Sequence, residues 1–250
     1  MSIKAFWKHR VLNFFDPINN PEFKIGLWAN CPVLAIQADP SIATVLLDDF
    51  FTFDTTKWAR TVYPAGAPGG TVGIADAVEG IYNTYCDGDD NDEAYVVSEG
   101  QSWLMATGKP LWFEAKFTFT NSATTAGVFC VGITDTEENM MLDDEGGPAA
   151  SYDGFVFYKE SGDANLNFET SLAGAQVENA TLNAFTSGTT YRLGIYYDGV
   201  TTITPYVDDV AKTAHTMATN TSEGSIIFGT KSNGAEEFIA MNYIKVVQMR

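Results

Sequence analysis

The stretch from Lys109 to Thr134 limits the fold of this chain more than any other part of the sequence. From Leu111 to Phe119 every second residue is apolar, which is the period-two pattern of a strand with one buried face. After a polar loop, the run from Val128 to Ile133 is apolar on both faces, as expected of a strand that is covered on both sides. Two such strands predict the middle of a β-sandwich.

Further strand patterns are spread along the chain, and turn residues separate them. Asp198-Gly199 predicts a two-residue hairpin turn, and Pro205 predicts an edge or a bulge in the next strand. Without a long helical pattern after residue 15, the fold class we expect is all-β, with two packed antiparallel sheets. One further strand is expected to begin at Val45. The remaining expected strands cover Gly80 to Tyr85, Ala94 to Val97, Gln101 to Met105, Tyr152 to Lys159, Leu166 to Ser171, Tyr191 to Tyr197, the region of Ile203, Ser225 to Thr230 and Phe238 to Val247.

Residues 1 to 45 are predicted to form an N-terminal arm, and residues 46 to 250 the sandwich domain. Residues 3 to 15 place apolar side chains at helical spacing with Lys4, Lys8 and Arg10 between them, which predicts a short basic amphipathic helix. Four prolines between residues 17 and 40 restrict the segment that follows to an extended path. The arm therefore combines a short helix with an extended, proline-rich segment.

The large apolar side chains of the arm need a surface on which to be buried. Three interpretations stay open: a helix on a membrane surface, a docking element for a partner, or a terminal segment packed on its own domain. Docking on a partner is the interpretation that we favour from the sequence. The candidate partner-binding residues are then Phe6, Trp7, Phe14, Phe15, Phe23, Leu27 and Trp28.

The amino-acid composition limits the classes of partner that the chain is expected to bind. The 32 Asp and Glu residues outnumber the 14 Lys and Arg residues, and a net charge of -18 argues against nucleic acid and against a membrane as the partner. Cys31, Cys86 and Cys130 lie far apart in the sequence, so no disulfide framework is expected. We recognise neither a secretory signal nor a membrane span, and we expect a protein that is made in a cytoplasm and needs no cofactor.

Aromatic strand segments recur from one end of the domain to the other: LLDDFFTFDTTKW, LWFEAKFTF, VFCVGITD, YRLGIYYDG and FIAMNYIKVVQMR. Together they resemble the concanavalin A-like lectin/glucanase jelly roll, over residues 46 to 250. More narrowly, CDGDDNDEAYVVSE, the Met-rich acidic loop from Asp135 to Ser151 and YDGFVFYKESGDANLNFETS resemble phage structural proteins of that fold that decorate icosahedral heads.

The resemblance implies what a hydrolase of this fold would need. Its glycosidases carry acids at alternating positions of one strand, ExDx(x)E, which point into one concave cleft. This sequence has no such triplet. Glu114 stands alone on its strand with Lys116 on the same face, which predicts a solvated pair, and Asp135, Glu137 and Glu138 are predicted to be surface acids. We therefore predict that the chain has no catalytic residues and is not an enzyme.

The acidic loop from Asp87 to Glu93 offers oxygen ligands at alternating positions, as calcium loops do. Position six is Asp92 where an EF-hand has Gly, and position twelve is Ser98 where it has Glu. An EF-hand is thereby excluded. Asp87, Asp89 and Asn91 stay a weak candidate metal loop, and the alternative is an acidic turn between two strands.

These observations lead to two functional expectations. The first is a phage capsid decoration or cement protein on the exterior of the virion, whose partners are the major capsid protein and other copies of the same chain, as a dimer or trimer. The second is a carbohydrate-binding, lectin-like module on the same fold, which would use exposed aromatic side chains and the Asp87 to Glu93 loop.

Overall fold

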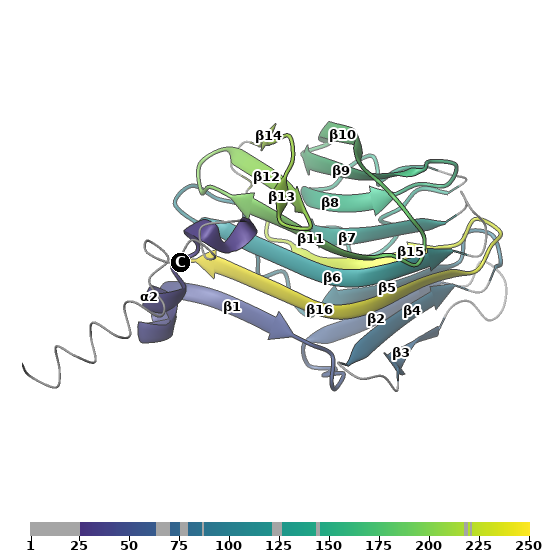
Figure 1. The fold of residues 1–250 in the computed structure, drawn as a ribbon, viewed down its shortest axis with the longest axis horizontal. Helices are drawn as coiled ribbons and strands as arrows, with labels where there is room; N and C mark the ends of the chain where they lie inside the picture. Colours follow the sequence, from purple (N-terminus) through teal and green to yellow (C-terminus); the bar gives the residue numbers. More distant parts are fainter. Residues whose placement is uncertain are drawn as a thin grey trace, which may run out of the picture.

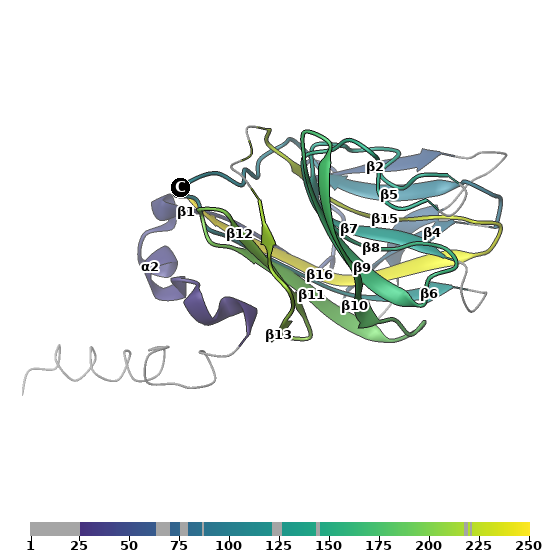
Figure 2. The same cartoon turned by 90° about the horizontal axis from the view of Figure 1, so that it is seen from above.

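The computed structural model describes residues 26–63, 71–75, 80–86, 88–121, 127–143, 146–217, 220 and 222–250. Within these residues two antiparallel sheets face each other as the layers of a sandwich (Figure 1; Figure 2). This arrangement confirms the predicted all-β sandwich of two antiparallel sheets, which is the architecture of a jelly roll.

Sheet A contains nine of the described strands and sheet B seven. The order in sheet A is β13-β12-β11-β6-β16-β4-β3, with β1 on the other half of β16 and β14 beside β12. The order in sheet B is β10-β9-β8-β7-β15-β5-β2. The strands of sheet A are β1 (Ala43–Asp48), β3 (Thr71–Ala75), β4 (Ile81–Cys86), β6 (Leu111–Asn121), β11 (Thr190–Tyr197), β12 (Thr202–Val207), β13 (Val210–Ala211), β14 (His215–Thr216) and β16 (Glu237–Met249). Those of sheet B are β2 (Trp58–Tyr63), β5 (Glu93–Ser98), β7 (Val128–Thr134), β8 (Gly154–Lys159), β9 (Asn165–Leu172), β10 (Ala175–Ala184) and β15 (Ser225–Lys231).

The two strands of the Lys109 to Thr134 stretch, β6 and β7, lie in opposite sheets. Their inward aromatic side chains meet between the layers, where the Phe117 and Phe129 rings pack edge to face with centroids 5.4 Å apart. Both rings are fully buried, and burying each contributes on the order of 2 kcal/mol. The alternating pattern of β6 therefore supplies one wall of the core, and β7 supplies the other.

Two local predictions are wrong. Gln101 to Met105 is no strand, because Trp103 makes only an isolated bridge to Gly224 while its side chain is buried. The connection after β11 is also longer than a two-residue turn. The carboxylate of Asp198 accepts the backbone N–H groups of Val200, Thr201 and Thr202, and these three bonds stabilise a wider loop.

The described part of the arm is not extended. It contains the 3-10 helix η2 (Leu27–Asn30), the helix α2 (Val33–Ala38) and the 3-10 helix η3 (Pro40–Ile42). Pro32 is the N-cap of α2 and Pro40 is the first residue of η3, positions where the missing N–H of proline costs no hydrogen bond. The helix predicted at residues 3 to 15 lies outside the described residues.

Residues 27 to 43 pack on the outer face of sheet A, beside the C-terminal end of β16 (Figure 2). Leu27 and Cys31 are buried there against Trp112 and Val247. A side chain at Gly194 would clash with this segment, because its Cβ would lie 2.4 Å from Leu27 Cδ2. Since β1 begins at Ala43, the predicted boundary between residues 45 and 46 falls inside a strand of sheet A.

The long acidic loop after β7 covers part of the outer face of sheet B. Met140, Met141 and Tyr152 from this loop form an apolar cluster with Tyr95 and Cys130 of the sheet. Lys231 of β15 holds the loop in place, because its ammonium donates to Glu93 Oε1 at 2.7 Å, to Met141 O at 3.1 Å and to Asp143.

Cys31, Cys86 and Cys130 are free thiols, and all three are buried. Among the residues that the structure describes, no helix has the length and apolar character needed to cross a membrane.

Candidate functional site

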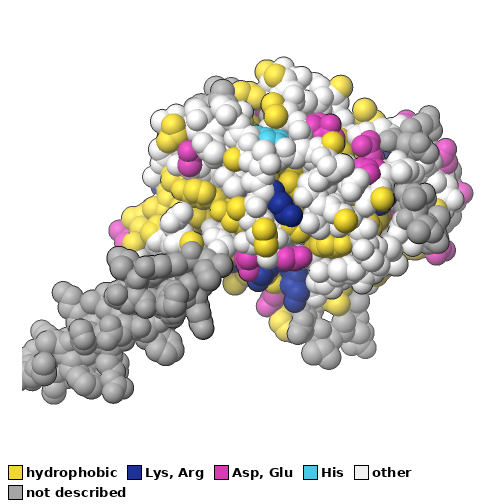
Figure 3. Space-filling model, turned by 45° about the horizontal axis from the view of Figure 1, so that its top comes forward, with side chains coloured by type: hydrophobic (Ala, Val, Ile, Leu, Met, Phe, Trp, Pro, Cys, Tyr) yellow, Lys and Arg dark blue, Asp and Glu magenta, His cyan; other side chains and the backbone are white. Residues whose placement is uncertain are grey.

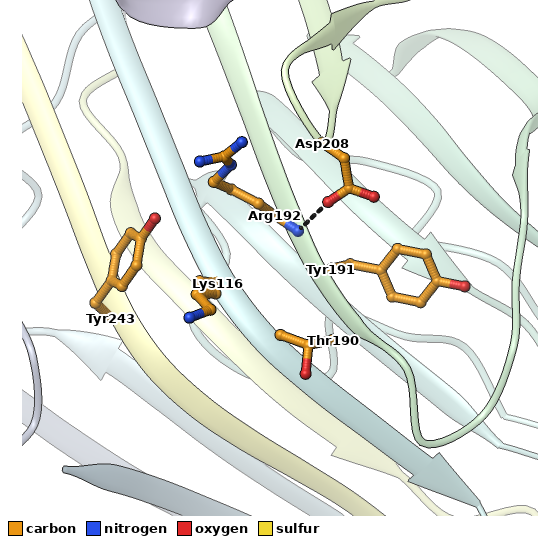
Figure 4. Close-up of a pocket in the computed structure, with 6 residues that line it drawn as sticks. All are labelled: Lys116, Thr190, Tyr191, Arg192, Asp208 and Tyr243. Atoms are coloured by element: carbon orange, nitrogen blue, oxygen red, sulfur yellow. Dashed lines mark hydrogen bonds between the residues drawn. The ribbon is translucent and has the colours of Figure 1, made fainter. Parts of the chain in front are cut away.

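A polar hollow of about 260 Å³ lies on the outer face of sheet A (Figure 4). Its lining comes from β6, β11 and β16 and from the turn between β12 and β13. Small-molecule sites usually measure about 300–1,000 Å³, so the hollow suits a single sugar ring or one short side chain. The lining residues are Lys116, Thr190, Tyr191, Arg192, Asp208 and Tyr243.

The register of the three strands brings the main polar groups into one row. Arg192 of β11 and Tyr243 of β16 are both cross-strand partners of Lys116 on the central strand β6. A register irregularity between Met241 and Tyr243 precedes this row. Bulges of this kind change the face to which the following side chains point, and here Tyr243 points outward into the hollow.

Glu114 is the centre of a hydrogen-bond network at one end of the hollow. Its carboxylate accepts Trp28 Nε1–H at 2.8 Å and the Tyr243 hydroxyl at 2.7 Å. Lys245, the cross-strand partner of Glu114, places its ammonium 3.7 Å from the centre of the Trp28 ring. Glu114 is only 6% exposed, so the prediction of a solvated pair with Lys116 is wrong: Trp28 of η2 covers it.

The turn between β12 and β13 adds two carboxylates to the rim. Asp208 and Asp209 both have positive φ angles, 49° and 64°, as a tight hairpin turn of the primed type requires. Asp208 Oδ1 accepts the backbone N–H of Arg192 at 2.9 Å (Figure 4), and Asp209 forms an ion pair with the Arg192 guanidinium. For the Lys116 ammonium, by contrast, the described residues provide neither an ion pair nor a hydrogen bond.

The Tyr243 hydroxyl stays protonated in this setting. Burial raises the pKa of its phenol, and the hydrogen bond to Glu114 raises it further, while the Arg192 guanidinium opposes both effects. The hollow therefore offers two cations, hydroxyl groups on Tyr243 and Thr190, and the acceptor oxygens of Asp208.

A second polar group lies on the outer face of sheet B. Glu169 of β9 and Glu178 of β10 are direct cross-strand partners. Glu169 is 6% exposed and accepts Tyr152 Oη–H at 2.9 Å and Gln176 Nε2–H at 2.8 Å, whereas Glu178 is exposed and accepts the Tyr158 hydroxyl. Two carboxylates thus share one surface in different surroundings.

Burial raises the pKa of the Glu169 carboxyl, and the nearby Glu178 and Glu160 add to the shift, while its hydrogen bonds with Tyr152 and Gln176 oppose it. A carboxyl whose pKa is raised above its ordinary value is what a general acid needs. No alternation along one strand reveals this pair, because its two members come from neighbouring strands.

A third polar group lies between the sheets at the start of β16. Glu237 is fully buried and faces Cys86 of β4 and Asn121 of β6 across the strands. Neither of its carboxylate oxygens has a hydrogen-bond partner among the described residues. Burial raises the pKa of Glu237 to about 8, although Lys159 acts in the opposite direction.

The structure places few of the residues predicted from the sequence at these sites. Leu27 is buried against sheet A and Trp28 donates to Glu114, while the other five candidate partner-binding residues, Phe6, Trp7, Phe14, Phe15 and Phe23, lie outside the described residues.

The candidate metal loop is likewise only partly described. Asp87 lies outside the described residues, Asp89 is exposed, and Asn91 has a φ of 67° in a turn. In the parts of the chain that the structure covers, no three His, Cys, Asp or Glu side chains come together as a metal site would require.

Comparison with solved structures places this architecture among known folds. A β-glucanase from Bacillus licheniformis is 11% identical, with a TM-score of 0.57, over 81% of this chain and 97% of that one. The VIP36 exoplasmic/lumenal domain, bound to Ca²⁺ and Man3GlcNAc, is 8% identical, with a TM-score of 0.57, over 80% of this chain and 86% of that one. The fold is the concanavalin A-like jelly roll.

A carbohydrate esterase from the Shiga toxin-encoding bacteriophage phi24B is also similar, at 13% identity and a TM-score of 0.51, over 78% of this chain and 90% of that one. A GH16 protein and an endo-glucanase from Bacteroides ovatus, the carbohydrate recognition domain of Emp46p and a glucuronan lyase from Trichoderma reesei share the fold at 10–15% identity. No protein-family model and no curated protein matches the sequence.

These similarities overturn the prediction that the chain is not an enzyme. The similar structures include glucanases and a lyase, so the fold is one that carries catalysis as well as sugar binding. The prediction relied on the missing acid triplet of a single strand. That criterion overlooks carboxylates that two neighbouring strands bring together, as β9 and β10 do with Glu169 and Glu178.

Proposed function

We propose that this chain binds saccharides in the hollow on the outer face of sheet A. The observation that carries the proposal is the row of Arg192, Lys116 and Tyr243 in a concave site of single-ring size. Saccharide sites combine an aromatic edge with a few convergent hydrogen-bonding groups, and this lining supplies both. The sugar-bound VIP36 domain, of the same fold, supports the class of ligand.

Replacing Tyr243 by Phe should weaken binding of a recognised oligosaccharide by about three- to tenfold, because one hydrogen bond contributes about 0.5–1.5 kcal/mol. The measurement is a screen of oligosaccharides with the intact chain, followed by calorimetric titration of the best ligand. Tyr206→Phe is the matched control, since Tyr206 lies on sheet A but outside the lining of the hollow. Unchanged affinity in Tyr243→Phe, together with loss in Glu169→Gln, would move the site to sheet B.

A second candidate is the attachment of the chain to a phage head as a decoration protein, with the major capsid protein and further copies of this chain as partners. It is favoured by exposed apolar side chains at and after the end of the arm: Val45 is 52% exposed, and Leu47 and Phe51 are each 65% exposed. Val45 and Leu47 belong to β1. Among the described strands β1 pairs with β16 alone, which makes it an edge strand. An apolar edge strand is a surface on which another chain can pair.

For this candidate, Leu47→Lys is expected to weaken binding to heads that lack the protein by at least about tenfold, since it places a charge in an apolar contact. Val177→Lys, a change at an exposed valine of β10, is the control and should bind normally. Deleting residues 1 to 25 tests the contribution of the arm independently of that of the edge strand β1, because the deletion leaves the packed segment from Leu27 intact. Full binding by Leu47→Lys and by the chain without residues 1 to 25 would contradict the attachment proposal. The readout is co-sedimentation with the heads.

A further inference from the structure

We propose that the hollow on sheet A is specific for an acidic sugar residue, whose carboxylate binds between Lys116 and Arg192. This inference rests on the proposed saccharide binding and adds the class of sugar.

The first argument is the pairing of like charges. Lys116 and Arg192 are direct cross-strand partners on the same face, and like charges in that position repel each other. Arg192 has Asp209 as its counter-ion, whereas Lys116 has no ion-pair partner among the described residues. The chain has only 14 basic residues against 32 acidic ones, so two adjacent basic side chains, one of them without an ion-pair partner among the described residues, are unusual for it. Figure 3 shows acidic side chains in small groups, with basic ones beside some of them. A bound anion would offset the repulsion.

The second argument concerns the charge of the ligand. The charged groups around the hollow are the cations Lys116, Arg192 and Lys245 and the carboxylates Glu114, Asp208 and Asp209. Glu114 is occupied by Trp28 and Tyr243, and Asp209 by Arg192. Lys116 is left without an ion pair among the described residues, so a single negative charge can pair with its ammonium, while a dianion such as phosphate would add excess negative charge beside Asp208. The planar guanidinium of Arg192, whose Nε lacks an acceptor among the described residues, matches the planar geometry of a carboxylate.

The third argument favours a sugar over an acidic peptide as the source of that carboxylate. Thr190, Tyr243 and Asp208 line the same hollow and provide a mixture of donors and acceptors that ring hydroxyls can use. The net charge of -18 repels polyanions at long range, which disfavours acidic peptides and polyuronates alike. The expected ligand is a mostly neutral glycan with one uronate.

The test compares two oligosaccharides of equal length, one with a single terminal glucuronate and one with glucose in that position, by calorimetric titration at low salt. The intact chain should bind the glucuronate form at least about tenfold more tightly, a difference of about 1.4 kcal/mol. Lys116→Met should abolish this preference, and added salt should reduce it. Lys57→Met, which removes an exposed lysine near β2, should retain it.

Three results would overturn the inference in different ways. In the first result, the intact chain binds both oligosaccharides equally tightly and Tyr243→Phe weakens the binding of both. This result would leave saccharide binding intact and refute the acidic specificity. Equally tight binding of N-acetylglutamate amide would refute a sugar as the source of the carboxylate. No binding of any oligosaccharide would refute the specificity and the proposed function together.

Discussion

Replacing Lys231 by Met is expected to lower the free energy of unfolding by about 3–5 kcal/mol, because the change leaves Glu93 buried without its counter-ion. The side chains of Lys231 and Glu93 are only 4% and 2% exposed. Burial raises the pKa of Glu93 even with Lys231 beside it. Burial also disfavours the charge on Lys231, but its hydrogen bonds to Asp143 and Glu93 outweigh that effect and keep its pKa above the ordinary value.

The measurement is chemical denaturation followed by fluorescence. The double variant Glu93→Gln/Lys231→Met provides the control, and it should recover much of the loss because no ionised group then stays buried at the site. Since Lys231 also donates to Met141 O and to Asp143, we expect the loop after β7 to be cleaved by proteases faster in the single variant. A single variant within about 0.5 kcal/mol of the parent chain would contradict this account.

Glu237→Gln is expected to stabilise the chain at pH 9 and to have little effect at pH 4. The pKa of Glu237 is about 8 in the folded chain against 4.5 for an ordinary glutamate, so the folded chain holds a proton that the unfolded chain has lost between these values. The contribution of Glu237 to the free energy of unfolding is therefore fully present below pH 4.5 and is lost as the pH rises through 8. The difference between a pKa of about 8 and one of 4.5 corresponds to about 5 kcal/mol of stability at most.

Denaturation of parent and variant from pH 4 to pH 9 provides the measurement. Lys159, Glu93, Glu160, Glu169 and His215 also have shifted pKa values, so only the difference between parent and variant isolates Glu237. Glu99→Gln, at an exposed position after β5, should follow the parent at every pH. A difference between parent and Glu237→Gln that does not grow with pH would refute a protonated Glu237.

The sequence predicts the sandwich well because period-two alternation is a local property. The pattern from Leu111 to Phe119 determines which face of β6 points into the core between the sheets, whatever the strand pairs with. The short helices near Pro32 and Pro40 escape prediction because proline both breaks helices and begins them, and the choice depends on the packing of Leu27 and Cys31 on sheet A.

The candidate sites depend on register, which no single segment encodes. Lys116 meets Arg192 only because β11 pairs with β6, although 75 residues separate them in the sequence. Glu169 meets Glu178 through the hairpin whose turn contains Ala173 and Gly174, both with positive φ. Acids at alternating positions are visible in one strand, whereas acids in neighbouring strands become a pair only after folding.

The three free cysteines give the folded chain a chemical property of practical use. Burial raises the pKa of Cys31 to about 11 and that of Cys86 to about 12, and it raises the pKa of Cys130 as well. At neutral pH almost none of these thiols is the reactive thiolate. Alkylating reagents should therefore modify the native cysteines only when the sandwich opens, and a cysteine introduced on an exposed strand could carry a fluorophore without competition from them.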